Sequence, residues 1–270
     1  AGTAITTGTQ NTAMGSSALV DNTTGGYNTG LGYIALFENT TGAYNTATGN
    51  GALRNNTTAN NNTANGYHAL HANTTGTSNT AVGTESLTAN TTANYNTAHG
   101  HKALKANTTG AGNTATGFVS LTANTTGSYN SGHGSETLYS NTTGANNTAS
   151  GVQALYFNTT ASYNTATGYR SLFYNTTGAS NTAVGWYSLF SNTTGGNNVA
   201  IGTSALQDAT TSVSNTAIGT SAGANVTTGT GENVMVGNRA GFGVTTGAQN
   251  IIIGDNACAN GTMTGGSNVI

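Results

Sequence analysis

Residues 11–27 read NTAMGSSALVDNTTGGY, and residues 28–44 repeat this pattern as NTGLGYIALFENTTGAY. The opening asparagine recurs at every seventeenth residue as far as Asn215, and later copies follow at steps of 18, 17 and 18. Self-similarity at a fixed period is the sequence signature of a repeat architecture, in which each unit contacts only its neighbours. The chain is therefore expected to be a stack of short, nearly identical coils.

The repeat unit has the composition of strands and turns rather than of helices. We number its positions one to seventeen, and the consensus is Asn-Thr-Ala-x-Gly-x-x-Ala/Ser-Leu-x-x-Asn-Thr-Thr-Gly/Ala-x-x. Helical hairpin repeats need about 33 residues or more, and Asn, Thr and Gly are poor helix formers. Positions two to nine suit a strand, and the Asn-Thr-Thr-Gly cluster suits a turn. The pattern predicts an all-β fold, a tandem-repeat parallel β-solenoid (β-roll) with about sixteen coils of 17–18 residues.

Because the repeat runs through the whole chain, we expect one elongated array over residues 1–270. Coils near the C-terminal end carry an apolar residue at position four, such as Ile218 and Ile253, which predicts a coil class with a thicker core. Both ends fall inside the repeat, which indicates a segment of a longer chain. The expected parts are a partial first coil (1–10), seventeen-residue coils (11–214) and variant coils with an apolar position four (215–270).

The interior of the stack is expected to contain a continuous row of leucines at position nine. Each leucine would contribute roughly 1.5–3 kcal/mol if it is fully buried. The small Ala at position three and Gly at position five indicate tight places where no larger side chain fits. The leucine row consists of Leu19, Leu36, Leu53, Leu70, Leu87, Leu104, Leu121, Leu138, Leu155, Leu172, Leu189 and Leu206.

Asparagines at positions one and twelve are expected to form ladders. Each side chain can donate to and accept from the copies above and below, which satisfies amides that are costly to bury unpaired. The alternative is that they only shape solvent-exposed turns. At position twelve the Asn-Thr-Thr motif is also formally an N-glycosylation acceptor, from Asn22 to Asn192, although turn chemistry explains it without modification.

The charge content excludes several classes of function. The chain has five Lys and Arg and seven Asp and Glu in 270 residues, with a net charge of −2. So few scattered basic residues make no nucleic-acid-binding surface, and no apolar run approaches the roughly 20 residues that cross a bilayer. The single cysteine, Cys258, provides no internal disulfide. Acid–base catalysis needs paired ionisable groups in one pocket, and the acidic residues are mostly several coils apart, so we expect no enzyme activity and no cofactor.

Two small groups of ionisable residues are candidate cation ligands. Asp21 and Glu38 share position eleven in adjacent coils and are expected about 5 Å apart, either as a weak cation site or as a solvated surface pair. His99 and His101 are two residues apart, so on a strand they point to one face. Three such pairs on the axis of a trimer would provide six imidazoles for a transition metal. The alternative is unrelated polar substitutions at tolerant positions.

Eight aromatic residues share neighbouring coils and form the candidate binding site. Tyr169 and Trp186 share position six, and three others share position ten, so stacked coils align them in columns with a step of about 4.8 Å. Exposed aromatic patches mark binding sites, here for sugars, but aromatic residues are also enriched where subunits meet. The eight residues are Tyr156, Phe157, Tyr169, Phe173, Tyr174, Trp186, Tyr187 and Phe190.

Several coils resemble repeats of known attachment proteins. Residues 181–185 read NTAVG, residues 198–202 read NVAIG and residues 215–219 read NTAIG. These motifs resemble the head repeats of trimeric autotransporter adhesins and the repeats of bacteriophage and bacterial tail-fibre proteins. The resemblance covers nearly the whole chain. It implies a parallel β-roll, often trimeric, that is displayed outside a cell or virion and used for attachment.

Together these observations favour an extracellular structural or adhesive fibre, the shaft or head of a tail fibre or adhesin that attaches to a cell surface. The expected partners are further copies of the chain, in a trimer or filament, and a cell-surface glycan or protein. The alternatives are a self-assembling filament without a receptor and an ice-binding solenoid. Thr-Thr at positions thirteen and fourteen places neighbouring side chains on opposite faces of a strand, which argues against a flat ice-binding array.

Overall fold

The computed structural model describes residues 4, 6–229, 231–260 and 263–270. The chain divides into two compact units, unit 1 with residues 1–135 and unit 2 with residues 136–270. Every strand has three residues and occupies positions two to four of its coil. Within the described residues all regular secondary structure is β-strand. This part of the chain accordingly includes no helix capable of crossing a membrane.

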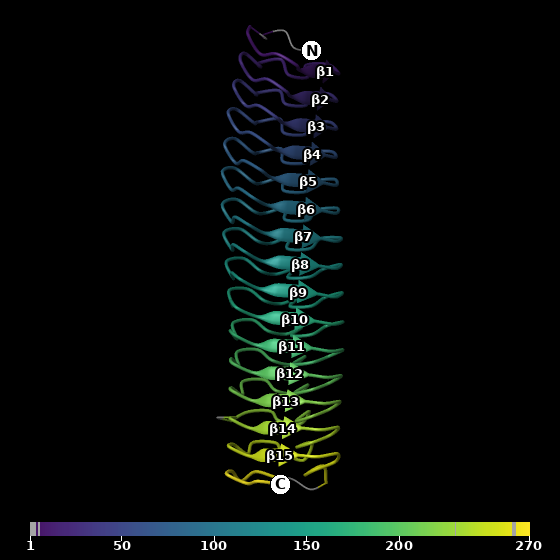
Figure 1. Cartoon of the computed structure of the whole chain (residues 1–270), viewed down its shortest axis with the longest axis vertical. Helices are drawn as coiled ribbons and strands as arrows, with labels where there is room; N and C mark the ends of the chain where they lie inside the picture. Colours follow the sequence, from purple (N-terminus) through teal and green to yellow (C-terminus); the bar gives the residue numbers. More distant parts are fainter. Residues whose placement is uncertain (1–3, 5, 230, 261–262) are drawn as a thin grey trace. The chain divides into compact units, whose positions relative to one another are not determined.

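Unit 1 is a parallel β-solenoid in which each strand pairs with the next strand along the chain (Figure 1). Paired residues occupy the same repeat position, as Thr12 and Thr29 do. The strands of unit 1 are β1 (Thr12–Met14), β2 (Thr29–Leu31), β3 (Thr46–Thr48), β4 (Thr63–Asn65), β5 (Thr80–Val82), β6 (Thr97–His99), β7 (Thr114–Thr116) and β8 (Ser131–His133).

Unit 2 has the same architecture and the same parallel pairing. Its strands are β9 (Thr148–Ser150), β10 (Thr165–Thr167), β11 (Thr182–Val184), β12 (Val199–Ile201), β13 (Thr216–Ile218), β14 (Val234–Val236) and β15 (Ile251–Ile253). The predicted all-β parallel β-solenoid is confirmed. Its fifteen strands in the described residues are close to the sixteen coils expected.

Each strand is shorter than the sequence pattern predicts, because the backbone turns sharply after position four. The coil that begins at Asn45 shows this, with positive φ at Gly49 (128°), Gly51 (65°) and Leu53 (49°). The expectation of a strand from position two to position nine is therefore wrong. Position five requires glycine for two reasons: its φ lies between 126° and 141° throughout, and a Cβ on Gly49 would lie 2.6 Å from the carbonyl oxygen of Gly66.

The leucines at position nine are all fully buried, with no exposed surface. Each adopts a left-handed conformation, with φ between 49° and 53°, which costs an L-residue roughly 1–2 kcal/mol. Burial of the side chain contributes roughly 1.5–3 kcal/mol and offsets that cost. The backbone is also bound to the next coil, since the N–H of Leu36 donates to the carbonyl oxygen of Ala52 at 3.0 Å.

Both asparagine positions form buried ladders. At position twelve, Asn39 Nδ2 donates to Asn22 Oδ1 at 2.6 Å and to the carbonyl oxygen of Gly42 at 2.9 Å. At position one, Asn28 Oδ1 accepts the backbone N–H of Asn45 at 3.0 Å. These asparagines have no exposed surface, so they belong to the interior rather than to solvent-exposed turns.

The variant coils enlarge their core at position three, not at position four. Ile218 and Ile253 are 39% and 60% exposed, so the thicker core expected from position four is wrong. Met235 at position three is instead fully buried in place of the usual alanine. It fills the space left where Gly241 replaces the leucine, because a Cβ on Gly241 would lie 2.7 Å from Met235 Cγ. The larger side chain at position three thus occupies space near the smaller residue at position nine.

Candidate binding surface

Seven positions of the repeat vary between coils, namely four, six, seven, ten, eleven, sixteen and seventeen. We call positions six, seven, ten and eleven the variable flank. Contacts with adjacent coils require small, apolar or amide side chains at positions one, three, five, nine and twelve, and the variable flank is free of that requirement. It carries every charged residue of the chain except Glu232. These are Asp21, Glu38, Arg54, Glu85, Lys102, Lys105, Glu136, Arg170, Asp208, Arg239 and Asp255.

The eight predicted aromatic residues form one connected cluster on the variable flank of unit 2, which we call the aromatic patch. Rings at position ten stack between coils, with centroids 5.2 Å apart for Tyr156–Phe173 and 5.4 Å apart for Phe173–Phe190. At position eleven, Phe157 stacks on Tyr174 at 5.5 Å. The structure therefore contains the predicted column of rings at position ten, and the stack beside it lies at position eleven, where the sequence pattern placed no column.

The aromatic residues at positions six and seven join the same patch. Trp186 lies against Tyr187 with ring centroids 4.0 Å apart, and Tyr187 lies 4.4 Å from Phe190. Tyr169 lies 5.7 Å from Tyr187. Phe173 is buried at the centre, 8% exposed, whereas Trp186 is 51% exposed. Tyr169, Tyr174 and Phe157 are exposed as well, so the patch offers several accessible rings around a packed centre.

A polar ladder at position seven, not foreseen from the sequence, runs beside the rings. Gln153 Nε2 donates to Glu136 Oε2 at 2.7 Å, and Arg170 Nε donates to Gln153 Oε1 at 2.6 Å. Arg170 Nη1 donates to the Tyr187 hydroxyl at 3.2 Å. The hydrogen bond to Tyr187 raises the pKa of Arg170, and burial raises the pKa of Tyr156. Their common repeat position was the signal that would have found this ladder.

Arg170 also contacts the aromatic patch directly. Its guanidinium carbon lies 5.0 Å from the ring centroid of Phe173 and 5.1 Å from that of Tyr169. A cation over an aromatic face is attracted by the ring quadrupole, so these contacts orient the arginine among the rings. Tyr139, also outside the predicted set, extends the position-ten column by stacking on Tyr156 at 4.9 Å.

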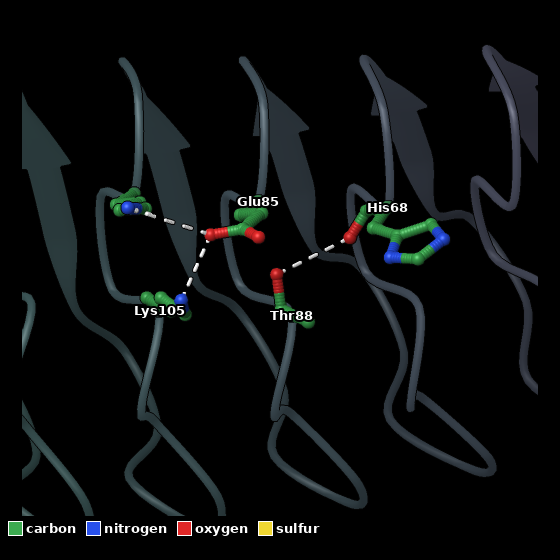
Figure 2. A network of polar contacts seen from close by, with 5 residues as sticks. His68, Glu85, Thr88 and Lys105 are labelled. Carbon is green, nitrogen blue, oxygen red and sulfur yellow. Dashed lines mark hydrogen bonds and ion pairs between the residues drawn. The ribbon is translucent and has the colours of Figure 1, made fainter.

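The variable flank of unit 1 carries ion pairs in place of the large aromatic cluster. Glu85 Oε2 accepts a hydrogen bond from Lys105 Nζ at 2.8 Å and lies 3.9 Å from Lys102 Nζ (Figure 2). The hydrogen bond from Lys105 lowers the pKa of Glu85. Glu38 lies 3.6 Å from Arg54 Nη1, so the acidic residue expected to pair with Asp21 has a basic partner.

The two histidines of the metal hypothesis do not share a strand. Strand β6 ends at His99, and Gly100 follows with φ of 141°. His101 lies beyond the strand and stacks on Phe118, with centroids 5.4 Å apart. The expectation that strand alternation places both histidines on one face is therefore wrong. In the part of the chain that the structure describes, no group of three or more His, Cys, Asp or Glu is placed to hold a metal ion.

Threonines at position fourteen are exposed in every coil from Thr24 to Thr211 and form a column within each unit. Those at position thirteen are half-buried, and their hydroxyls bind the next coil, as Thr40 Oγ1 does by donating to the carbonyl oxygen of Thr57 at 3.1 Å. The two threonines therefore provide one outward column rather than two. The asparagine before them is buried with its amide donating inside the stack, as described for Asn39, so the formal glycosylation acceptor faces the interior.

A further set of exposed aromatic residues, which the sequence pattern did not single out, lies at position seventeen. Five tyrosines at position seventeen are 50–70% exposed and have φ between 58° and 63°. Applying the seventeen-residue step to tyrosine alone would have revealed them. They are Tyr27, Tyr44, Tyr95, Tyr129 and Tyr163.

The aromatic patch with Arg170 joins eight aromatic side chains, several of them exposed, to one guanidinium. Comparison with known proteins finds no matching family model and no matching curated protein. The chemistry of the variable flank is therefore the basis for assigning a function.

Proposed function

We propose that this chain is an adhesive module of an extracellular fibre, and that the aromatic patch of unit 2 binds a glycan on a cell surface. The observation that supports the proposal is the cluster of exposed rings around Phe173, which stack upon one another and upon Arg170. Aromatic rings with a negative quadrupole face suit the polarised C–H groups of sugar rings. Exposed apolar patches of this kind mark interaction sites.

The rest of the coil makes a suitable support for such a surface. Within each unit, backbone hydrogen bonds connect successive coils, and the seventeen-residue coils add the leucine row and two asparagine ladders, so the flank side chains project from a hydrogen-bonded frame. Pre-organised binding surfaces lose little conformational entropy when a ligand binds. A solenoid can therefore present a precise contact surface without a pocket.

Self-association is the second candidate function, favoured by exposed apolar residues on the strand face of unit 2. Ile201, Ile218, Ile251 and Ile253 are 38–60% exposed on strands β12, β13 and β15. Such a face suits contact with further copies of the chain, in a trimer or a filament. The resemblance to trimeric attachment proteins supports the same interpretation.

The test is the double variant Trp186→Ala/Tyr174→Ala in the full chain. Its binding to a glycan array, followed by calorimetry with the best glycan, is expected to weaken at least tenfold, about 1.4 kcal/mol, because interface energy concentrates in Trp and Tyr. The melting temperature should stay within a few degrees, since both side chains are exposed. Tyr33→Ala is the matched control, because Tyr33 shares position six with Trp186 and is 55% exposed in unit 1.

Light scattering on the same proteins separates the two candidates. A fall in oligomer mass in the double variant, with glycan binding unchanged, would assign the patch to a contact between copies. Wild-type protein that binds no glycan on the array would contradict the proposal outright.

A further inference from the structure

Arg170 is a cation whose hydrogen-bond partners are neutral. Its Nε atom donates to the Gln153 amide oxygen and its Nη1 atom donates to the Tyr187 hydroxyl. Among the described residues Arg170 forms no ion pair, and its Nη2 atom makes no hydrogen bond. A guanidinium carries five N–H donors in a planar fork, so an edge of this fork remains available to a ligand.

The basic residues of the variable flank in unit 1, unlike Arg170, form ion pairs with acidic residues. Arg54 pairs with Glu38, and Lys102 and Lys105 both pair with Glu85. Each of these three cations therefore has an acidic partner in a neighbouring coil. Arg170 has no such partner, although an acidic residue occupies the same repeat position nearby.

Gln153 keeps that acidic residue away from the arginine. Position seven is occupied in successive coils by Glu136, Gln153 and Arg170, and Gln153 donates to the Glu136 carboxylate while it accepts from Arg170. Adjacent coils are separated by about 4.8 Å, so the acid and the base are two coils, or about 10 Å, apart. The positive charge of Arg170 is therefore not neutralised within its own ladder.

We propose that Arg170 binds the carboxylate of an acidic sugar, a uronic or a sialic acid, whose ring lies on the neighbouring exposed aromatic residues. This inference rests on the proposed function and specifies the class of glycan that the aromatic patch takes. The planar fork of arginine matches a carboxylate in geometry. One cation, with Glu136 further along the same ladder, suits a group with a single negative charge rather than a doubly charged phosphate.

The experiment compares acidic ligands with neutral counterparts of the same backbone. The full chain is titrated with polygalacturonate and with its fully methyl-esterified form, and separately with sialyllactose and with lactose. We expect at least tenfold tighter binding to the acidic member of one pair, with an affinity that falls as salt increases. The pair that shows the difference identifies the uronic or the sialic source.

Two variants assign that difference to Arg170. Arg170→Gln should abolish the preference for the acidic ligand, while Arg170→Lys should retain part of it. The exchange Glu136→Gln/Gln153→Glu keeps the composition and net charge but places the carboxylate beside Arg170. It should remove the acidic preference as Arg170→Gln does, and each variant is judged by the ratio of its affinities for the acidic and the neutral ligand rather than by either affinity alone.

The outcomes distinguish this inference from the function on which it rests. Equal binding of acidic and neutral ligands by the wild type overturns the role of Arg170 and leaves glycan attachment standing. A preference for the acidic ligand that survives in Arg170→Gln overturns it as well. Failure of the wild type to bind any of the four ligands or any glycan on the array removes both proposals.

Discussion

The left-handed residues of each coil show how burial decides which side chain a backbone position tolerates. Leu104 at position nine and Tyr95 at position seventeen have φ of 51° and 60°. Both conformations are unfavourable for a bulky L-residue. Leu104 is fully buried, so the burial of its side chain offsets the cost of the left-handed conformation. Tyr95 is 70% exposed, so burial offsets little of that cost. Other coils place Asn61 or Asn197 at position seventeen, and asparagine tolerates this conformation well.

The same substitution at these two residues should therefore act in opposite directions. Tyr95→Asn is expected to stabilise the protein by up to about 1 kcal/mol, because the left-handed strain is relieved and little burial is lost. Leu104→Asn is expected to destabilise it by more than about 3 kcal/mol, through a cavity and an unpaired amide. Thermal unfolding followed by circular dichroism measures both. If Tyr95→Asn lowers the melting temperature, the tyrosine contributes packing that its exposure does not reveal.

At the scale of one coil, the sequence predicts the solenoid and its buried row but not the path of the backbone. The period, the invariant glycine at position five and the recurring leucine at position nine specify which residues stack, and these were sufficient to predict the parallel fold. The three-residue strand was not predictable, because positive φ at Leu53 contradicts the local preference of leucine and is stabilised by contacts with adjacent coils. The local conformational propensity of a residue does not include the effect of contacts between coils.

The variant coils test whether core volume is shared between positions three and nine. Met235→Ala should cost about 2–5 kcal/mol by leaving a cavity. Gly241→Leu alone should cost about 1–3 kcal/mol, because Met235 occupies the space that the new side chain needs. The double variant restores the consensus pair and should be more stable than the sum of the single effects by at least about 1 kcal/mol. Additive effects in chemical denaturation would show that the two positions do not share volume.

At the scale of the whole molecule, the residues that stabilise the fold and the residues that vary between coils occupy different repeat positions. The aromatic patch was visible in the sequence because its members share repeat positions. The shared position of Glu136, Gln153 and Arg170 was visible as well, but the hydrogen bonds between them were not, since these depend on rotamers that a sequence pattern does not specify. His99 and His101 were wrongly expected to lie on one strand, because the turn at Gly100 could not be anticipated.

Because the repeat unit is the coil, deletions should be tolerated only in whole units. Removal of residues 96–112 joins Tyr95 to Asn113 in register, and the melting temperature should change by only a few degrees. Removal of residues 96–103 leaves the leucine row and both asparagine ladders out of register and should abolish cooperative unfolding. Equal tolerance of the two deletions would contradict the assignment of the coil.

The short step between coils has a mechanical consequence. One coil advances the stack by about 4.8 Å, yet its seventeen residues span about 60 Å when fully extended. A coil that peels away under tension therefore releases about 55 Å of slack, while the coils behind it keep their hydrogen bonds. Under a pulling force the chain is therefore expected to lengthen in discrete steps of one coil, and each step dissipates work.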